Sequence, residues 1–325
     1  IFGKHLNTGN PVGAPPGVDR WLVNGGGEYN NPTFSFASAG TPGTSAHFNN
    51  CTGGPCYSTA VIGNATLEWI RSVRRASSPP KPFFAYVPFQ AVHTPVQAPQ
   101  EFIDHYMSAY DDGWETLRKQ RAERAAQMGI VPKAIGMVEM TSTKDWAALS
   151  PERKRYEAKR MAVYAGMIEA MDFHIGRLVA YLKAQGVYEN TIFIVTSDNG
   201  AEASGPDDPS QVSSSRMAQS LGYHQDYERL GLKGSYSSMG PSFASAAASP
   251  LAFYKFYAGE GGMRVPLIVT GVAVAQANSI THAFSWATDI PPTVLSLAGV
   301  EQPGSRYAGK PVLPISGKSL VPLLN

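Results

Sequence analysis

The sequence is poor in charge and has no long hydrophobic run. Charged residues make up 16% of its 325 residues, and 27 Lys and Arg against 25 Asp and Glu leave a formal net charge of +2. A nearly neutral chain offers no whole-molecule attraction to nucleic acid or to an acidic membrane. No stretch approaches the ~18 apolar residues of a membrane span, and the first residues show no basic-then-apolar signal pattern. The composition, 43% hydrophobic, indicates a globular protein with no nucleic-acid partner and no membrane span.

Cysteine is almost absent, because Cys51 and Cys56 are the only two. Two cysteines cannot supply the four ligands of a structural zinc site. Their close spacing in a loop containing Gly and Pro favours a short disulfide, with two free thiols as the alternative. Asn50-Cys51-Thr52 and Asn64-Ala65-Thr66 both fit the N-glycosylation pattern. These features predict a glycoprotein of a secreted, lysosomal or periplasmic compartment.

Hydrophobic spacing divides much of the remaining sequence into helices and strands. Helical spacing covers three segments, at residues 59–75, 100–129 and 152–185. Nearly continuous apolar runs of strand length occur at residues 83–89, 191–197 and 266–269. Such runs are typical of strands buried on both faces. Asp289, followed by two prolines in a first turn, predicts another helix that closes at Gly299.

The alternation of strands with helices predicts an α/β fold with a mostly parallel central sheet and helices on both faces. No internal repeat is present, and we expect residues 1–325 to form a single domain. The charged segment at 100–129 is expected to lie on the surface. The Ser-, Gly- and Ala-rich residues 203–250 predict a long surface excursion that can build a pocket wall.

Two loops place unusual polar side chains directly after predicted strands. His93 follows the first strand, and Asp198-Asn199-Gly200 follows the second. In open parallel sheets, functional groups gather beyond the carboxyl ends of the strands. The side-chain oxygens of Asp198 and Asn199 suit Ca²⁺ or Mg²⁺ better than zinc, although Asp-Asn-Gly is also a common turn sequence. His93 is likewise open to a catalytic or a structural interpretation.

Five short motifs occur in a fixed order along the chain. They are Gly3-Lys4-His5-Leu6-Asn7, residues 81–95 with Gln90-Ala91-Val92-His93-Thr94-Pro95, residues 190–200 with Ser197-Asp198-Asn199-Gly200, Gly261-Gly262-Met263-Arg264-Val265-Pro266, and Asp289-Ile290-Pro291-Pro292-Thr293. Together they resemble the sulfatase family of the alkaline phosphatase superfamily, over nearly the whole chain. The region 240–266 is most similar to bacterial arylsulfatases, whereas Gly-Lys-x-Leu-Asn is more like the glucosamine-6-sulfatases.

This resemblance implies an alkaline phosphatase-like fold and hydrolysis of a sulfuric ester, an aryl or a sugar sulfate. The family uses one divalent cation, usually Ca²⁺, and a formylglycine nucleophile made from the Cys or Ser of Cys/Ser-x-Pro-x-Arg. Carried over by motif, Asp198 and Asn199 hold the metal. Lys4 neutralises the nucleophile or a sulfate oxygen, Lys255 binds a sulfate oxygen, and His93 binds or protonates near the leaving oxygen. This assignment requires these side chains to line one pocket.

Two parts of the family pattern are absent from the sequence. No Cys/Ser-x-Pro-x-Arg occurs, and the family's amino-terminal pair of Asp metal ligands is missing. Family members place both upstream of the Gly-Lys motif, and the chain ends about where the family passes into its carboxy-terminal subdomain. We therefore expect a partial sulfatase catalytic domain that does not turn over sulfate esters as given. His5 follows Lys4 directly, one position earlier than the family's histidine, so no role is carried over to it.

Two choices stay open at this point. Lys233, before Gly234, resembles the Lys-Gly that other sulfatase branches use for the sulfate contact, but the spacing of Lys255 before Gly261-Gly262 is that of the bacterial arylsulfatases. The alternatives to a sulfatase are a phosphate or phosphonate ester hydrolase of the same superfamily and a noncatalytic sulfate- or glycan-binding relative. A Cys/Ser-x-Pro-x-Arg encoded upstream of Ile1 would favour the enzyme.

Overall fold

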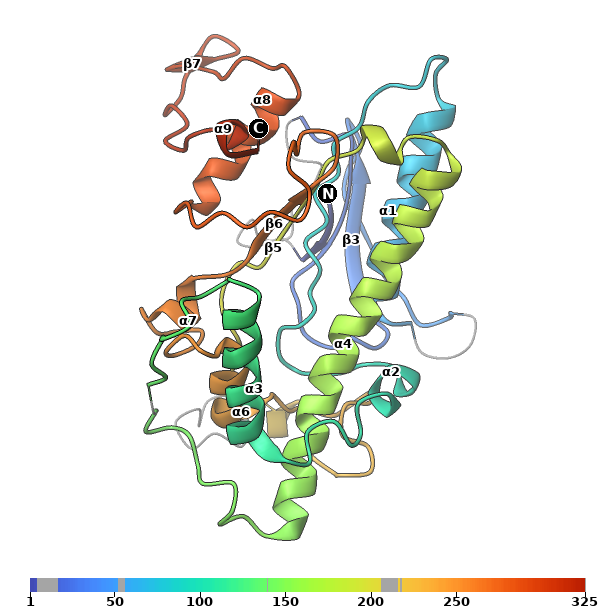
Figure 1. Cartoon of the computed structure of the whole chain (residues 1–325). Coiled ribbons are helices and arrows are strands. Elements are labelled where there is room, and N and C mark those ends of the chain that lie inside the picture. The colour runs from blue at the N-terminus through green and yellow to red at the C-terminus, as the bar shows by residue number, and fades with distance from the viewer. Residues whose placement is uncertain (5–16, 52–55, 139, 206–215, 217, 325) are drawn as a thin grey trace.

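The computed structural model describes residues 1–4, 17–51, 56–138, 140–205, 216 and 218–324 (Figure 1). The strands are β1 (Phe2–Lys4), β2 (Arg20–Asn24), β3 (Thr33–Ser38), β4 (Thr44–His47), β5 (Phe193–Thr196), β6 (Leu267–Thr270), β7 (Arg306–Tyr307) and β8 (Lys310–Pro311). The helices are α1 (Ser58–Arg75), α2 (Gln100–Asp104), α3 (Gly113–Gln127), α4 (Pro151–Ala184), α6 (Gly240–Ala248), α7 (Glu260–Met263), α8 (Ile290–Leu297) and α9 (Val321–Leu324), with 3₁₀ turns η1 (Tyr188–Asn190) and η2 (Ala287–Asp289). None of the described helices is both long enough and apolar enough to span a membrane.

The α/β class is as predicted, with the strands arranged as one four-stranded sheet and two pairs. The four-stranded sheet has the order β1-β2-β3-β4. β1 and β2 are parallel, whereas β2–β3 and β3–β4 are antiparallel. The pairs β5–β6 and β7–β8 are antiparallel as well. Among these strands only β1–β2 is parallel. The short connections from β2 to β3 and from β3 to β4 favour antiparallel returns.

Residues 83–89 run alongside β1 instead of forming a strand buried on both faces. The backbone amides of Phe2 and Lys4 donate to the carbonyls of Tyr86 and Pro88, at 3.0 and 2.7 Å. The two segments therefore run in the same direction and end at the same edge. The side chains of Phe84 and Tyr86 are 68% and 51% exposed, while the alternate residues pack into the core. Only one face of this apolar run is covered, which corrects the prediction.

The β5–β6 pair shows the same difference from expectation. Both strands form where the sequence predicts them, but Val195 and Ile268 are 45% and 56% exposed. A two-stranded antiparallel pair has one covered and one open face, so apolar side chains on the open face stay accessible. The antiparallel register places Thr196 opposite Leu267. The loop after β5 and the residues before β6 therefore lie at the same end of the pair.

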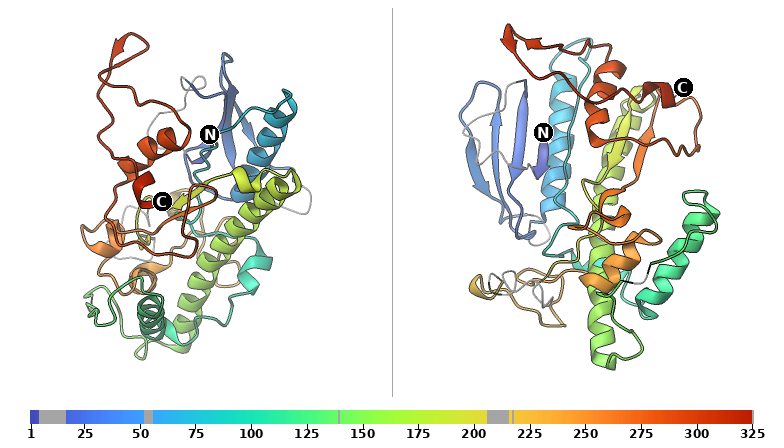
Figure 2. Two further views of the ribbon diagram at one scale, coloured as in Figure 1. Left: turned by 45° about the horizontal axis from the view of Figure 1, so that its top comes forward. Right: turned by 90° about the vertical axis from the view of Figure 1, so that its left-hand side faces the viewer.

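The two long helices confirm the helical spacing read from the sequence. α1 packs against β1, β2 and α4, and its Ile62, Trp69 and Ile70 join a hydrophobic cluster with Phe2 and Leu182. Figure 2 shows α1 between the four-stranded sheet and α4. α4 begins after Ser150, whose hydroxyl accepts a hydrogen bond from the Arg153 amide. Its buried methionines are packed in the core, as expected.

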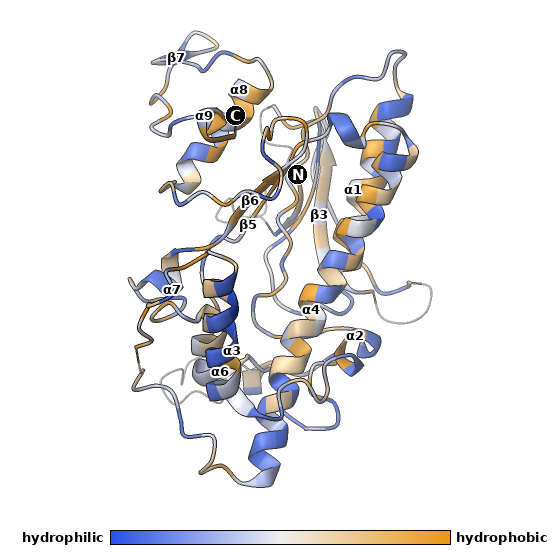
Figure 3. Ribbon diagram, in the orientation of Figure 1, coloured by the Kyte–Doolittle hydropathy of each residue, from blue (hydrophilic) through white to orange (hydrophobic). Residues whose placement is uncertain are grey.

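The charged segment at 100–129 divides into α2 and α3. Gly113 begins α3 with a φ of +82°, and a Cβ there would lie 2.4 Å from the Trp146 ring. Glycine is required at this turn because other residues rarely adopt that backbone conformation. Figure 3 shows α3 as mainly hydrophilic. The charged face of this helix is solvated, as the sequence predicts, while Trp114 packs against Phe243 of α6.

Residues 203–250 are only partly a surface excursion, which corrects the prediction that this segment lies on the surface. Met239 and Phe243 are completely buried, and α6 packs against α3. Ser238 is buried too, and the Arg160 guanidinium of α4 donates to its carbonyl oxygen. The polar composition misled the sequence interpretation, since serines of this segment lie inside the fold, and the Ser238 hydroxyl donates to the Ala203 carbonyl at 3.0 Å. Residues 206–215 and 217 lie outside the described part of the chain.

The predicted disulfide and the predicted carboxy-terminal helix are both present. Cys51 and Cys56 are bonded, with their Cα atoms 5.1 Å apart. α8 follows Asp289, whose carboxylate accepts hydrogen bonds from the amides of Trp286 and Lys318 at 2.8 and 2.7 Å. These backbone amides hold the pKa of Asp289 below its usual value. Asp289 thus joins the start of α8 to a segment 29 residues further along.

Candidate active site

Lys4 and His93 are brought to the same edge by the parallel course of β1 and residues 83–89. Lys4 ends β1, and His93 lies in the loop that follows residue 89. Gly3 has a φ of +144°, and a Cβ there would lie 1.8 Å from the carbonyl oxygen of Pro88. Only glycine therefore allows β1 to approach residues 83–89 closely enough for their hydrogen bonds.

The His93 loop is held by a buried tyrosine and a buried glutamine. The Tyr29 hydroxyl lies 2.8 Å from the carbonyl oxygen of Gln90 and 2.9 Å from that of His93. The Gln90 amide donates to Gly27 and accepts from Asn24, at 2.6 and 2.7 Å. These contacts satisfy the polar groups of the Gln90 side chain, which is nearly inaccessible to solvent. The backbone on which His93 sits is therefore rigidly supported.

The hydrogen bond of the His93 ring defines its tautomer. Nδ1 lies 2.7 Å from the carbonyl oxygen of Thr94. A carbonyl can only accept, so in the neutral ring Nδ1 carries the proton and Nε2 carries the lone pair. Burial lowers the pKa of His93; the Thr94 carbonyl opposes this, and the positive charges of Lys4 and Lys255 lower the pKa further. His93 is therefore neutral at pH 7, with Nε2 available to accept a proton or hydrogen bond.

The Asp198 loop is joined to the Gly261-Gly262 motif by close backbone contact. The Gly200 amide donates to the Gly262 carbonyl at 2.9 Å. A Cβ on Gly200 would lie 1.8 Å from the carbonyl oxygen of Gly261, and one on Gly261 would lie 2.2 Å from that of Phe253. The glycines are thus needed so that three backbone segments can meet. This contact places the loop after β5 directly beside residues 252–257.

Lys255 reaches the site from that neighbouring segment. Its backbone amide donates to the Ala201 carbonyl at 2.9 Å, and its Nζ lies 2.5 Å from Oε2 of Glu202. The Lys255 side chain is 15% exposed and the Glu202 side chain 6%. Glu202 was missed by the sequence analysis. Its only signal is its position four residues after Asp198, in a loop that follows a strand.

Lys4, His93 and Lys255 are within electrostatic reach of one another, and Asp198 is within reach of Lys4. Burial lowers the pKa of Lys4, and the Lys255 ammonium lowers it further, while Asp198 and Glu202 act in the opposite direction. The pKa of His93 is likewise lowered by Lys4 and Lys255 and raised by Glu202. Lys4, His93 and Lys255 thus come from three separate motifs and influence one another, while Asp198 is linked to them through Lys4. Among the described interactions, none connects the exposed Lys233 to Lys4 or His93. His5 lies outside the described residues.

The proposed metal ligands have the right chemistry but form an incomplete set. The side chain of Asp198 is exposed and provides carboxylate oxygens. The Asn199 amide nitrogen donates to the Gly200 carbonyl at 3.0 Å, which leaves Oδ1 as the atom available for a ligand. Hard oxygen donors fit Ca²⁺ or Mg²⁺. In the described part of the chain, no group of three or more His, Cys, Asp or Glu residues is placed to hold a metal.

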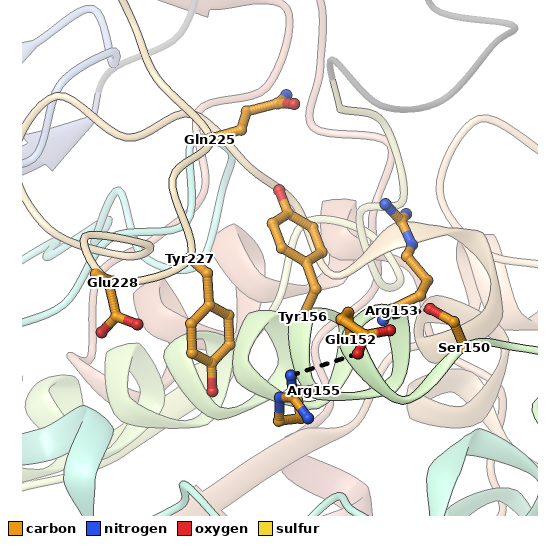
Figure 4. A pocket seen from close by; sticks show the side chains of 8 residues that line it. All are labelled: Ser150, Glu152, Arg153, Arg155, Tyr156, Gln225, Tyr227 and Glu228. Atoms are coloured by element: carbon orange, nitrogen blue, oxygen red, sulfur yellow. Dashed lines mark hydrogen bonds and ion pairs between the residues drawn. The ribbon is translucent and has the colours of Figure 1, made fainter.

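A separate hollow lies at the start of α4. It has a volume of about 620 Å³ and lies between the first turns of α4 and residues 225–228 (Figure 4). Arg153 and Tyr156 point into it from the helix, and Tyr227 faces them from the loop. None of the residues predicted to form the site lines this hollow. The candidate active site is therefore the cluster around Glu202 and not this hollow.

Comparison with known proteins agrees with this cluster of motifs. The sulfatase family model matches residues 17–300. The chain is 34% identical over 264 residues to an uncharacterized sulfatase of Schizosaccharomyces pombe, covering 81% of this chain and 47% of that protein. It is 32% identical over 267 residues to an arylsulfatase of Klebsiella aerogenes, covering 81% and 55%. The chain thus spans about half the length of these relatives.

Solved structures show the same fold. One was determined in complex with its substrate D-glucosamine-2-N,6-O-disulfate; it superposes with a TM-score of 0.53 at 19% identity, covering 99% of this chain and 61% of that chain. Another, in complex with k-i-k-neocarrahexaose, gives a TM-score of 0.51 at 20% identity, covering 94% and 50%. At such identities the likeness establishes the alkaline phosphatase-like fold alone. Because the sulfatase family model matches most of this chain, the chain belongs to the sulfatase family.

Proposed function

We propose that this chain carries part of the active site of a sulfuric ester hydrolase that acts on aryl or sugar sulfates. The observation that supports this most directly is the meeting of Lys4, His93 and Lys255 beside the Asp198 loop. Two ammonium groups suit the oxygens of a sulfate ester, because charge on those oxygens is the main feature that the site must stabilise. The formylglycine nucleophile of the proposed reaction has no counterpart motif within residues 1–325.

The two lysines and the histidine would act in different ways. Lys4 and Lys255 would bind sulfate oxygens, each through a charged N–H donor. His93 in its neutral form presents the Nε2 lone pair, so it donates a proton only after it is protonated. A bound sulfate ester brings negative charge close to the ring, which raises the pKa of His93 and favours the imidazolium. His93 would then be able to protonate the leaving oxygen.

We also propose that Asp198 and Asn199 supply two oxygen ligands to one divalent cation, Ca²⁺. When bound, the cation would polarise a sulfate oxygen as a Lewis acid. Because Ca²⁺ takes six to eight oxygen ligands, two protein ligands predict weak binding, with a dissociation constant of about 10⁻⁴ M or higher. Calcium titration calorimetry of the chain tests this, with Asp198→Ala expected to abolish binding and Asp172→Ala on exposed α4 surface to leave it unchanged. Nanomolar binding that survives Asp198→Ala would contradict the assignment.

Binding of 4-nitrophenyl sulfate distinguishes the two candidate lysines. We expect Lys255→Ala to weaken binding about tenfold, about 1.4 kcal/mol, because a charge-assisted contact is lost. Lys233→Ala removes an exposed lysine from the same half of the chain and is expected to change binding less than about twofold. The assignment fails if Lys233→Ala has the larger effect or if neither variant changes binding.

The same measurements separate the alternative functions. Tighter binding of 4-nitrophenyl phosphate than of the sulfate would favour a phosphate or phosphonate ester hydrolase. From residues 1–325 we expect binding without release of nitrophenol, since they contain no Cys/Ser-x-Pro-x-Arg. Release that is abolished by His93→Ala would require a nucleophile elsewhere in this chain.

For location, we propose a secreted, lysosomal or periplasmic protein, with Asn50 as the glycosylated residue where the host adds glycans. Asn50 is exposed and precedes the Cys51–Cys56 disulfide. Asn64 lies within α1 and accepts a hydrogen bond from Arg177 at 2.7 Å, and Thr66 of its motif is buried. Expression through a eukaryotic secretory pathway should give a mass increment that N-glycosidase removes and that Asn50→Gln prevents.

A further inference from the structure

Glu202 is a buried carboxylate whose two oxygens are both engaged. Oε1 accepts hydrogen bonds from the backbone amide of Ser204, at 3.0 Å, and from the Ser204 hydroxyl. Oε2 lies 2.5 Å from Nζ of Lys255. The carboxylate cannot rotate without losing one of these partners. The Glu202 carboxylate is therefore fixed in orientation, with Oε1 held by Ser204 and Oε2 facing Lys255.

Lys255 has a long side chain that the fold fixes at both ends. At the backbone, its amide donates to the carbonyl of Ala201, the residue before Glu202. At the tip, the ammonium contacts Glu202 and lies 5.1 Å from the centroid of the Phe256 ring. Ordering a lysine costs as much conformational entropy as ordering any side chain. A charge-assisted contact at the end of the side chain offsets part of that cost.

We propose that Glu202 is a positioning residue that holds the Lys255 ammonium beside the loop that carries Asp198. The proposal rests on the proposed function, in which Lys255 contacts a sulfate oxygen. An ammonium has three N–H donors, so one can point to Glu202 while others face the ester. Glu202 does not touch the substrate in this arrangement and acts through Lys255.

A simple electrostatic role for Glu202 predicts the opposite result. An unpaired negative charge near an anion site weakens anion binding, so removing it strengthens binding. If Glu202 positions Lys255, the neutral Glu202→Gln variant weakens binding instead, because the ammonium is released from the site. Glutamine has nearly the same shape and can still accept from Ser204, so this substitution changes mainly the charge.

The first test needs no substrate. Competitive acetylation followed by mass spectrometry measures the reactivity of Lys255 relative to the exposed Lys233 in the same molecule. We expect Glu202→Gln to raise this ratio at least about threefold, because the Lys255 side chain loses the partner that holds it and becomes more accessible to the reagent. Glu260→Gln removes an exposed carboxylate paired with Arg264 and serves as the matched control, with no change in the ratio expected. An unchanged ratio in Glu202→Gln would overturn the proposal.

The second test measures 4-nitrophenyl sulfate binding in two backgrounds. We expect Glu202→Gln to weaken binding about fivefold in the wild-type chain and not to weaken it in Lys255→Ala, as for two residues that act as a pair. Equal strengthening in both backgrounds would show simple repulsion and overturn the proposal. Glu202→Asp keeps the charge and should recover part of both readouts, which also covers failure of the glutamine variant to fold. If Lys255→Ala leaves ester binding unchanged while Glu202→Gln still activates Lys255 to acetylation, the positioning stands and the proposed function fails.

Discussion

Replacing Gly200 with alanine should destabilise the protein through one backbone contact. A Cβ at this position would lie 1.8 Å from the carbonyl oxygen of Gly261, where real contacts are at least 3.0 Å. The φ of Gly200 lies outside the left-handed range, so space and not backbone conformation excludes alanine. The two segments must separate by about 1.2 Å to reach 3.0 Å, which stretches the 2.9 Å hydrogen bond from the Gly200 amide to Gly262 beyond bonding distance.

The expected loss follows from these two effects. Overpacking against a backbone atom that cannot rotate away costs about 1–3 kcal/mol, and the lost hydrogen bond costs about 1 kcal/mol. Urea unfolding of Gly200→Ala should therefore show a free energy of unfolding lower by about 2–4 kcal/mol. Acetylation of Lys255 should also increase, because its segment moves away from the Asp198 loop.

Gly176→Ala is the matched control for this substitution. Gly176 is exposed on α4, and a Cβ there meets no atom within 4 Å. Alanine has the higher helix propensity, so stability should rise by about 0.5–1 kcal/mol. Gly200→Ala with the stability of the wild type, measured beside a stabilised Gly176→Ala, would refute the steric reasoning.

Two further predictions concern stability away from the site. Burial, with a contribution from Arg177, lowers the pKa of His174 to about 4, and Arg177 donates to its Nδ1 at 3.0 Å. In the unfolded chain the histidine binds its proton near pH 6.5, so the free energy of unfolding should fall by about 1–2 kcal/mol between pH 6.5 and pH 4, after allowance for solvent screening. Urea titrations at both pH values measure this loss, and His174→Gln should remove it. Phe243 is fully buried, and its ring centroid lies 5.3 Å from that of Trp114. Phe243→Ala should lower the free energy of unfolding by about 3–5 kcal/mol. Leu313→Ala, at a side chain 95% exposed, should change the thermal midpoint little, and equal effects of the two variants would contradict the assigned core.

The sequence predicted helices and strands well where the hydrophobic pattern extended over many residues. α1 and α4 lie within one residue of their expected limits, and β5 and β6 form where apolar runs were found. Exposure was harder to predict, because an apolar run looks the same whether one or both faces are covered. Burial of the Ser-rich residues 235–238 was also hidden, since their partners, such as Arg160, lie far away in the sequence.

Motifs located the candidate site, but they could not reveal how its parts are joined. Gly261-Gly262 was a recognisable signal, and the structure adds the reason for it, which is the contact with Gly200 and residues 252–257. Glu202 carries no motif of its own, and its importance arises only from its 2.5 Å contact with Lys255. Long-range ion pairs of this kind depend on tertiary packing, which local patterns do not encode.

The charges at the candidate site suggest why it can form before a ligand arrives. Lys4 and Lys255 contribute two positive charges, and Asp198 and Glu202 contribute two negative ones, while His93 is neutral at pH 7. Without these carboxylates, two partly buried ammonium groups would repel each other. The two carboxylates balance the two ammonium charges, so the site without a cation has no net charge to attract an anion. A divalent cation held by Asp198 and Asn199 would leave the site with a net positive charge, and so we expect sulfate-ester binding to strengthen with calcium and to lose that dependence in Asp198→Ala.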